Sequence, residues 1–266
     1  GIRETPKVVG GITPECSRRA EALYGAVCDT VHPVSTPESA EMSKIIENTF
    51  RAVNIALVNE LAMLADRMGI DIWEAIEASS TKPFGFMPFW PGPGLGGHCI
   101  PIDPFYLAWR ARAFDTDSEF VELAGRINVN MPYYATSRIA RSLNARGKAV
   151  KDAQVLLLGM AYKADVGDLR ESPSLKLLEL LRAEGADVTY HDPHVATLPD
   201  EGLSSVELTP EMLAAADCVV IATAHTAVDL AIVVEYADLV VDLRNAVRHR
   251  LGDGVSGAVP VNVDVL

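Results

Sequence analysis

The sequence has only four cysteines, Cys16, Cys28, Cys99 and Cys218, and no Cys-x-x-Cys pair among them. This spacing predicts neither a metal site nor a framework of disulfide bonds. Long apolar runs are also missing, since none reaches the roughly 18 to 20 residues that a membrane-spanning helix needs. The first residues lack the basic stretch and apolar core of a secretion signal. We therefore expect a cytoplasmic protein with no membrane partner.

Basic residues are scarce: 23 lysines and arginines face 36 aspartates and glutamates, for a net charge of −13. Binding to nucleic acid depends on clustered cations that displace counterions from phosphates, so the charge argues against a nucleic-acid partner. A small phosphate-bearing ligand would need a local basic pocket.

A dinucleotide fingerprint is missing as well, because the glycines of residues 92–97 follow Phe89-Trp-Pro instead of an apolar strand.

Three stretches with different patterns divide the chain. Residues 1–36 predict a short strand, a helix and a second strand, which together are too little to bury a core. Residues 37–150 are predicted to be helical, with a Pro- and Gly-rich loop over 83–98. Residues 151–266 alternate strands and helices, which is typical of a doubly wound parallel sheet. The expected fold is α/β, with an all-helical central domain followed by a Rossmann-like domain.

Ligands bind such a sheet at the carboxyl ends of its strands. Strands are expected at 155–159, 187–191, 218–222 and 239–242. Polar or sharply turned residues follow each of them: Gly159–Tyr162, Asp192, Thr223 and Arg244. The sequence therefore predicts that these residues meet at one edge of the sheet.

The longest predicted helix runs from Pro37 to Met68. Thr36 supplies an N-cap, Pro37 the first helical position and Gly69 a stop. At 1.5 Å per residue this helix would be about 48 Å long. One side carries large apolar residues: Ile45, Ile46, Phe50, Val53, Leu57, Leu61 and Leu64. Because one small domain cannot cover such a helix, we expect a homodimer through residues 37–69.

Residues 92–104 read Gly-Pro-Gly-Leu-Gly-Gly-His-Cys-Ile-Pro-Ile-Asp-Pro and contain the candidate nucleophile, Cys99. A thiol after a run of glycines lies on tightly turned backbone, where main-chain N–H groups and a substrate carbon can approach. Asp103, four residues on, would return beside the sulfur within one helical turn. Taken alone, the loop could equally be a connector with an incidental cysteine. His98 could act as a base for Cys99, although adjacent side chains rarely point at each other.

Two further motifs accompany this loop. Lys44 and Asn48, in Lys-Ile-Ile-Glu-Asn, are four residues apart and share one face of the long helix, a spacing that is also common on solvated helix faces. Residues 159–170 read Gly-Met-Ala-Tyr-Lys-Ala-Asp-Val-Gly-Asp-Leu-Arg. Together with the Cys99 loop, these motifs resemble the nucleotide-sugar dehydrogenases, the UDP-glucose/GDP-mannose dehydrogenase family. The loop is most similar to the UDP-N-acetylhexosamine 6-dehydrogenase branch.

The resemblance implies NAD-dependent oxidation of the C6 hydroxyl of a UDP-sugar to the acid. Cys99 would add to the aldehyde, and the resulting thiohemiacetal would become a thioester that water opens. Lys44 and Asn48 would hold the reacting oxygen and a water, and Asp103 would orient water or act as base. In the family, 1–36 would be a remnant of the NAD-binding domain, 37–150 the dimerising catalytic domain and 151–266 the UDP-sugar-binding domain. Most of the NAD-binding domain is thus expected to be missing.

The resemblance also implies the residues that hold the ligands. The phosphate end would be held by the loop before the cysteine, with Gly96 beside the nucleophile; that loop consists of Pro88, Phe89, Trp90, Pro91 and Gly92. Lys163 would reach the nucleotide-sugar, Arg170 would reach the NAD phosphate, and Arg244 is a further candidate for an anion contact. The aromatic residues of 84–90 could stack on uracil or sugar, or equally pack the helical domain.

One position departs from the pattern of UDP-glucose dehydrogenases, which have Cys-x-Pro-Lys-Asp with a lysine that touches the cofactor. Ile102 stands there in this chain, which disfavours UDP-glucose as the substrate.

Two other functions stay open: a catalytically silent UDP-sugar-binding and dimerisation fragment, and the C-terminal domain of a 6-phosphogluconate- or hydroxyacid-type dehydrogenase. The latter has no reason to carry Gly-Gly-His-Cys with an aspartate four residues on. His191 and His194 resemble a metal pair but are expected to end a strand and turn.

Overall fold

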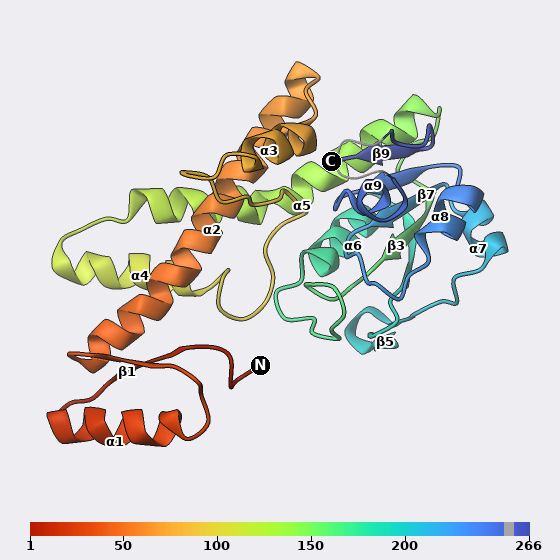
Figure 1. Cartoon of the computed structure of the whole chain (residues 1–266). Helices are drawn as coiled ribbons and strands as arrows, with labels where there is room; N and C mark the ends of the chain where they lie inside the picture. Colours follow the sequence, from red (N-terminus) through yellow and green to blue (C-terminus); the bar gives the residue numbers. More distant parts are fainter. Residues whose placement is uncertain (253–257) are drawn as a thin grey trace.

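The N-terminal part is a small strand–helix–strand unit in the computed structural model, which describes residues 1–252 and 258–266. Strands β1 (Lys7–Gly10) and β2 (Val31–Val34) pair in parallel, and α1 (Pro14–Gly25) connects them (Figure 1). Thr13 caps α1 by accepting the N–H of Cys16. None of the residues of α1, all of which the structure describes, is buried. The unit therefore has little core of its own, as the sequence predicted.

Two long helices cross to form the middle part (Figure 1). Helix α2 spans Pro37–Met68 and α5 spans Glu119–Ala145, while α3 (Ile72–Ser80), α4 (Asp103–Ala111) and the 3-10 turn η1 (Arg112–Phe114) pack beside them. The hydroxyl of Thr36 accepts the N–H of Ser39 at the start of α2, and Gly69 ends the helix with a φ of 69°. Both signals are local, and the predicted helix is confirmed.

Helix α2 turns its small and polar side chains toward the rest of the chain. Its buried residues are Asn48, Ala52, Ala56, Val58, Asn59, Ala62 and Ala65. Small side chains allow two helices to approach closely at their crossing. The large apolar side chains of Ile46, Phe50, Leu57, Leu61 and Leu64 stay exposed. The described part of the chain thus leaves uncovered much of the face that the sequence assigned to a dimer contact.

The C-terminal part is a five-stranded parallel sheet in the order β4-β3-β7-β8-β9. Its strands are β3 (Gln154–Leu158), β4 (Asp187–His191), β7 (Cys218–Ile221), β8 (Val240–Asp242) and β9 (Val263–Val265). Its helices are α6 (Pro173–Ala183), α7 (Pro210–Ala215), α8 (Leu230–Tyr236) and α9 (Ala246–Leu251). A small hairpin, β5 (Thr197–Leu198) and β6 (Leu203–Ser204) around the 3-10 turn η2 (Pro199–Glu201), lies beside β4.

Both faces of this sheet are buried. Val155 and Leu157 of β3 pack in one core with α5 and α6, whereas Leu156 and Leu158 pack in a second core with α7, α8 and α9. Successive side chains of a strand point to opposite faces, so a continuous apolar run fits a sheet covered on both sides. The doubly wound parallel sheet is confirmed. Every helix among the described residues is too short or too polar to cross a bilayer.

Candidate active site

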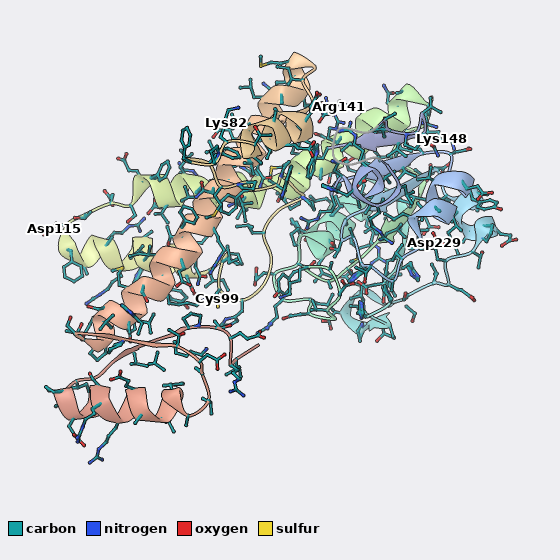
Figure 2. All side chains as sticks on the ribbon, in the orientation of Figure 1. Lys82, Cys99, Asp115, Arg141, Lys148 and Asp229 are labelled. Atoms are coloured by element: carbon teal, nitrogen blue, oxygen red, sulfur yellow. The ribbon has the colours of Figure 1, made fainter. Side chains whose placement is uncertain are left out.

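Cys99 lies on the loop between α3 and α4, where the helical part meets the C-terminal sheet (Figure 2). Its side chain is half-buried. The carbonyl oxygen of Cys99 accepts hydrogen bonds from the N–H groups of Ile102 at 3.1 Å and Asp103 at 2.8 Å. This turn starts α4 and brings Asp103 back toward residue 99, as the sequence predicted.

Asn48 links Asp103 to the long helix. Its Nδ2 donates to Asp103 Oδ2 at 2.5 Å, although 55 positions separate the two residues in the chain. The Asn48 Oδ1 accepts a hydrogen bond from Lys44 Nζ at 3.1 Å. Asn48 is buried, with 1% of its surface exposed, whereas Lys44 is exposed. Lys44, Asn48 and Asp103 are therefore joined by side-chain hydrogen bonds, and the main-chain turn at Cys99 begins four residues before Asp103.

Arg51 is a member of this group that the sequence interpretation missed. Its Nη2 donates to Asn48 Oδ1 at 2.7 Å, and its Nε is buried without a partner among the described residues. Arg51 follows Lys44 by seven positions and Asn48 by three, so the three residues share one helix face. That spacing was the signal that could have found it. The group thus contains two cations and the carboxylate of Asp103, and Glu47 Oε2 lies 3.9 Å from Arg51 Nη2.

His98 lies beside the candidate nucleophile, but its ring nitrogen is far from the sulfur. Its Nδ1 lies 3.9 Å from Cys99 Sγ, and the imidazole is exposed. Hydrogen bonds that move a proton are much shorter, about 2.6 to 3.2 Å between heavy atoms. This geometry agrees with the expectation that the two adjacent side chains do not point directly at each other.

Buried amides anchor the loop that precedes Cys99. The Gly92 N–H donates to Asn59 Oδ1 at 3.0 Å, and Asn59 Nδ2 donates to Asn128 Oδ1 at 3.0 Å. Asn128 Nδ2 in turn donates to the carbonyl oxygen of Ala52 at 2.9 Å. The relay joins the loop to α2 and α5. It also occupies the N–H of Gly92, one of the residues expected to hold phosphate.

Two of the aromatic side chains near this loop pack against the helical part. The ring of Phe89 meets Phe50 edge-on, with centroids 5.7 Å apart. The indole of Trp90 stacks on Trp73 at 5.5 Å with an angle of 12° between the planes. Their rings are thus engaged within the protein. Phe84 is 79% exposed, so it remains available to a ligand.

The loop after β3 packs on the glycines before Cys99. The N–H of Gly97 donates to the carbonyl oxygen of Arg170 at 2.9 Å. A side-chain carbon added to Gly96 would lie 2.5 Å from Tyr162 Cβ and 2.8 Å from the carbonyl oxygen of Glu171. Only glycine allows this approach. Gly96 therefore lies where the two halves of the candidate site touch.

Arg244 approaches the same loop from the end of β8. Its Nε donates to the carbonyl oxygen of Ala222 at 2.8 Å. A side-chain carbon added to Gly92 would lie 2.5 Å from Arg244 Nη1, so the guanidinium borders the loop before the cysteine. Burial lowers the pKa of Arg244 to about 10, and the nearby Asp242 opposes part of this effect. The side chain stays positively charged near neutral pH.

The other two predicted ligand-binding cations are exposed. Lys163 Nζ lies 5.2 Å from the ring centre of Tyr162 and has no ion pair among the described residues. Arg170 Nη2 pairs with Asp168 Oδ2 at 2.6 Å. The hydrogen bonds from Arg170 lower the pKa of Asp168 to about 2, and the pairing raises the pKa of Arg170. An anion that binds Arg170 must therefore compete with Asp168.

The glycines of residues 92–97 lack the surroundings of a dinucleotide-binding turn. The glycines of 92–97 have suitable spacing, but residues 81–102, all of which the structure describes, contain no strand or helix. A phosphate-binding glycine turn needs a strand before it and a helix directly after it. Arg170, which the resemblance assigns to the NAD phosphate, is engaged by Asp168. Residues 92–97 are therefore not an NAD-binding turn, and Arg170 would have to leave Asp168 to hold an NAD phosphate.

Two models of one protein family match the chain. The central domain of the UDP-glucose/GDP-mannose dehydrogenase family matches residues 38–130, and the UDP binding domain of that family matches residues 156–249. The chain belongs to the UDP-glucose/GDP-mannose dehydrogenase family. The resemblance seen in the three sequence motifs is thereby confirmed.

Individual relatives carry more specific names. The chain is 34% identical over 224 residues to a UDP-N-acetyl-D-mannosamine dehydrogenase of Methanococcus maripaludis, a match over 84% of this chain and 50% of the relative. It is 37% identical over 219 residues to the protein of that name from Pyrococcus horikoshii, over 82% of this chain and 50% of the relative. The solved structure of UDP-D-ManNAc dehydrogenase from Pyrococcus horikoshii has a TM-score of 0.84 and 31% identity, over 99% of this chain and 60% of that chain. The chain spans about half the length of the curated relatives it matches.

Proposed function

We propose that this chain is the substrate-binding and cysteine-bearing part of an NAD-dependent UDP-sugar 6-dehydrogenase, with a UDP-N-acetylhexosamine as the favoured substrate. The observation that carries the proposal is the contact of Asn48 with Asp103 at the turn that holds Cys99. The names of the relatives support the choice of sugar. Ile102 supports it as well, because it stands where UDP-glucose dehydrogenases have a lysine.

Conversion of the C6 alcohol to the acid requires two oxidations of two electrons each, and Cys99 acts after the first of them: its thiolate adds to the C6 aldehyde carbon. The new C–S bond moves an electron pair onto the aldehyde oxygen, and Lys44 stabilises the resulting negative charge. Two molecules of NAD, when bound in turn, would each accept one hydride, for the oxidation of the alcohol to the aldehyde and of the thiohemiacetal on Cys99 to the thioester. Water held by Asn48 and Asp103 then attacks the thioester carbon: Asp103 takes a proton from the water, the C–S bond breaks and the thiolate leaves the acid.

The remaining predicted residues are assigned to the ligands in the same proposal. Lys163 and Arg244 would meet the pyrophosphate, and the chain from Pro88 to Gly92 would line the phosphate end. Arg170 would meet NAD phosphate after release from Asp168. The division into residues 1–36, 37–150 and 151–266 is kept as the proposed domain organisation, although residues 253–257 of the last range lie outside the described residues. The matches to a central and a UDP binding domain support this division.

Calorimetry with UDP, UDP-N-acetylglucosamine, UDP-glucose and GDP-mannose tests the binding half of the proposal. We expect weak binding of UDP and UDP-sugars and no NADH formation by these 266 residues alone, because the glycines of residues 92–97 lack the strand and helix of a dinucleotide-binding turn. Absence of any UDP binding would refute a UDP site. Rapid NADH formation by the chain alone would show that the cofactor is bound here after all.

A second candidate function is a catalytically silent UDP-sugar-binding and dimerisation fragment. The glycines of residues 92–97, which have no strand before them and no helix directly after them, favour it. Joining these 266 residues to an NAD-binding region of the family gives what we term the completed enzyme. NADH formation by the completed enzyme supports the dehydrogenase, whereas UDP-sugar binding without turnover supports the silent fragment.

We also propose a homodimer through α2. The double substitution Leu57→Glu and Leu61→Glu is expected to convert a dimer into a monomer, because it places charges on an apolar face that is 52% and 41% exposed at these positions. Sedimentation velocity at micromolar concentration measures the change, and circular dichroism checks that helicity is kept. Leu23→Glu, on the exposed side of α1, is the matched control and should leave the dimer intact. A monomeric unsubstituted chain would contradict the proposal.

A further inference from the structure

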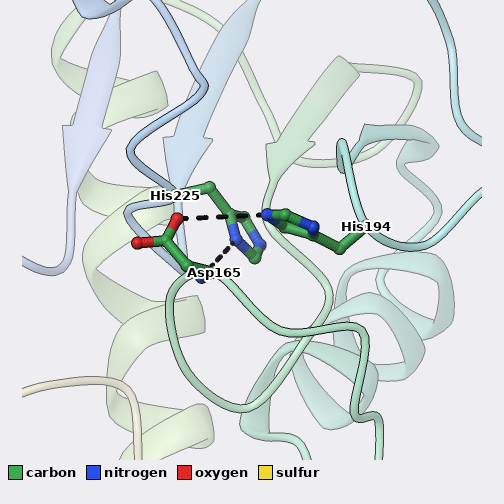
Figure 3. A group of neighbouring side chains, drawn as sticks. All are labelled: Asp165, His194 and His225. Carbon is green, nitrogen blue, oxygen red and sulfur yellow. Dashed lines mark hydrogen bonds and ion pairs between the residues drawn. The ribbon is translucent and has the colours of Figure 1, made fainter.

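His225 is completely buried after the end of β7, and both of its ring nitrogens are hydrogen-bonded. The N–H of Asp165 donates to Nδ1 at 3.0 Å, and Nε2 lies 3.0 Å from Asp192 Oδ2. Figure 3 shows the imidazole beside Asp165 and His194. Because Nδ1 accepts a hydrogen bond, the proton lies on Nε2, which donates to Asp192. One side chain thus joins the loop after β3 to the residue that follows β4.

Asp192 fixes the start of the loop after β3. Its Oδ2 accepts the N–H groups of Met160 at 2.7 Å and Ala161 at 3.1 Å, and its Oδ1 accepts the N–H of His194 at 2.7 Å. Burial by itself would raise the pKa of this carboxyl group, but the hydrogen bonds from His225 and the backbone hold it at about 2. Asp192 is therefore a charged anchor that keeps its hydrogen bonds throughout the neutral range.

Asp165 fixes the other end of the same segment. It has a φ of 62°, a left-handed conformation that a residue with a side chain adopts only when its surroundings hold it there. The Nδ1 of His225 accepts the N–H of Asp165. The Oδ1 of Asp165 accepts the N–H of Thr226 at 2.8 Å and its hydroxyl at 2.9 Å. Lys163 stands between these two anchors. Tyr162 lies in the same segment, and a side-chain carbon added to Gly97 would be 2.9 Å from the Tyr162 ring.

We propose that His225 is a positioning residue for the nucleotide site: it fixes residues 160–165 so that Lys163 is presented to the pyrophosphate and Tyr162 supports the glycines before Cys99. The inference rests on the proposed function, which assigns a UDP-sugar to Lys163. His225 itself touches neither the sugar nor the sulfur in this account. It acts through the N–H of Asp165, because Asp192 accepts the N–H groups of Met160 and Ala161 without it.

The same cluster also has the composition of a metal site. The ligand atoms of Asp165, His194 and His225 lie within 4.8 Å of one another. Their hydrogen bonds argue for support of the loop instead, because Nδ1 of His225 already accepts the N–H of Asp165 and Asp165 Oδ1 already accepts two hydrogen bonds from Thr226. A metal ion at Nδ1 would have to break the first of these bonds. His194, in the turn after β4, stays 3.9 Å from Asp165 Oδ1.

Two substitutions separate the roles of the ring nitrogens. His225→Asn keeps an acceptor near the position of Nδ1, whereas His225→Gln can reach Asp192 but offers no acceptor to the N–H of Asp165. We expect His225→Asn to bind UDP nearly as tightly as the unsubstituted chain. We expect His225→Gln to bind it about ten-fold more weakly, the effect of losing roughly one hydrogen bond that holds the loop. Calorimetry measures the affinity, and thermal melting records stability separately.

His194→Ala is the matched control, because its side chain touches His225, with ring centroids 4.9 Å apart, but donates no hydrogen bond to the 160–165 loop. It should leave UDP affinity within about two-fold, well below the effect of one lost hydrogen bond. Equal UDP affinities for His225→Asn and His225→Gln would overturn the positioning role, whatever their melting temperatures. Stabilisation of the unsubstituted chain by zinc chloride, lost in His194→Ala, would also overturn it and make the cluster a metal site.

If the proposed function is wrong, the unsubstituted chain itself fails to bind UDP, which differs from a loss of binding confined to His225→Gln. If the unsubstituted chain binds no UDP, the ligand assigned to Lys163 is wrong, and the positioning role is then measured by hydrogen exchange of residues 159–168. His225→Gln should speed exchange in this segment and His225→Asn should not. Equal exchange in the two variants would overturn the inference.

Discussion

Replacing Cys99 with serine is expected to lower the rate of acid formation by the completed enzyme by about 10³-fold or more, the scale seen when a nucleophile is removed. Serine has nearly the same size but is a weak nucleophile near neutral pH without a neighbouring base. His98 Nδ1, at 3.9 Å from the sulfur, is too distant to act as one. UDP-sugar affinity should change little, because Lys163 and Arg244 are untouched. Chromatography of the acid product in quenched single-turnover samples measures the rate, and calorimetry measures the affinity.

Cys16→Ser is the control for this prediction. Cys16 is an exposed free thiol on α1, so its substitution tests for a general effect of losing a thiol. It should leave the rate unchanged. If Cys99→Ser kept most of the rate of acid production, Cys99 would be an incidental residue of a connecting loop.

Replacing Lys44 with alanine is expected to slow the completed enzyme by about 10²- to 10³-fold, the range for removal of one donor to a developing oxyanion. Lys44 Nζ donates to Asn48 Oδ1 at 3.1 Å, and Asn48 in turn donates to Asp103, so the ammonium is held at the group that surrounds the turn of Cys99. Steady-state kinetics with saturating UDP-sugar and NAD measures the loss.

Lys151→Ala, which removes an exposed lysine near the start of β3, is the matched control and should have no effect on the rate. A loss of less than about three-fold for Lys44→Ala would fall far short of an oxyanion donor. Lys44 would then be part of a solvated helix face, the alternative that its spacing in the sequence leaves open.

Features of the fold that depend on neighbours in the chain could be predicted from the sequence. Thr36 and Gly69 bound α2 because capping and the left-handed stop act within one turn. The return of Asp103 to Cys99 is likewise a single helical turn. The apolar run of β3 predicts a strand buried on both faces. By contrast, β9, at the end of the chain, has only three residues and is held by pairing with β8, so it leaves no local pattern.

Contacts between distant segments could not be predicted in this way. Asn59 and Asn128 are 69 positions apart, and neither sequence neighbourhood shows that their amides meet beneath Gly92. The roles of Phe89 and Trp90 were undecided because an aromatic ring suits a core as well as a nucleobase. In the structure Phe89 meets Phe50 edge-on and Trp90 stacks on Trp73, contacts that neither sequence neighbourhood shows. Family resemblance pointed to Lys163, but it did not show that His225 accepts the N–H of Asp165 in the same loop.

Mass spectrometry of Cys99 during turnover tests the central claim most directly. The completed enzyme is mixed with UDP-N-acetylhexosamine and NAD, quenched in acid within the first turnover, digested and mapped. The account predicts a transient UDP-uronyl adduct on the peptide that contains Cys99, sensitive to hydroxylamine as a thioester is, and absent without NAD. Acid formation with no adduct at any time, or with the adduct on another residue, would contradict it.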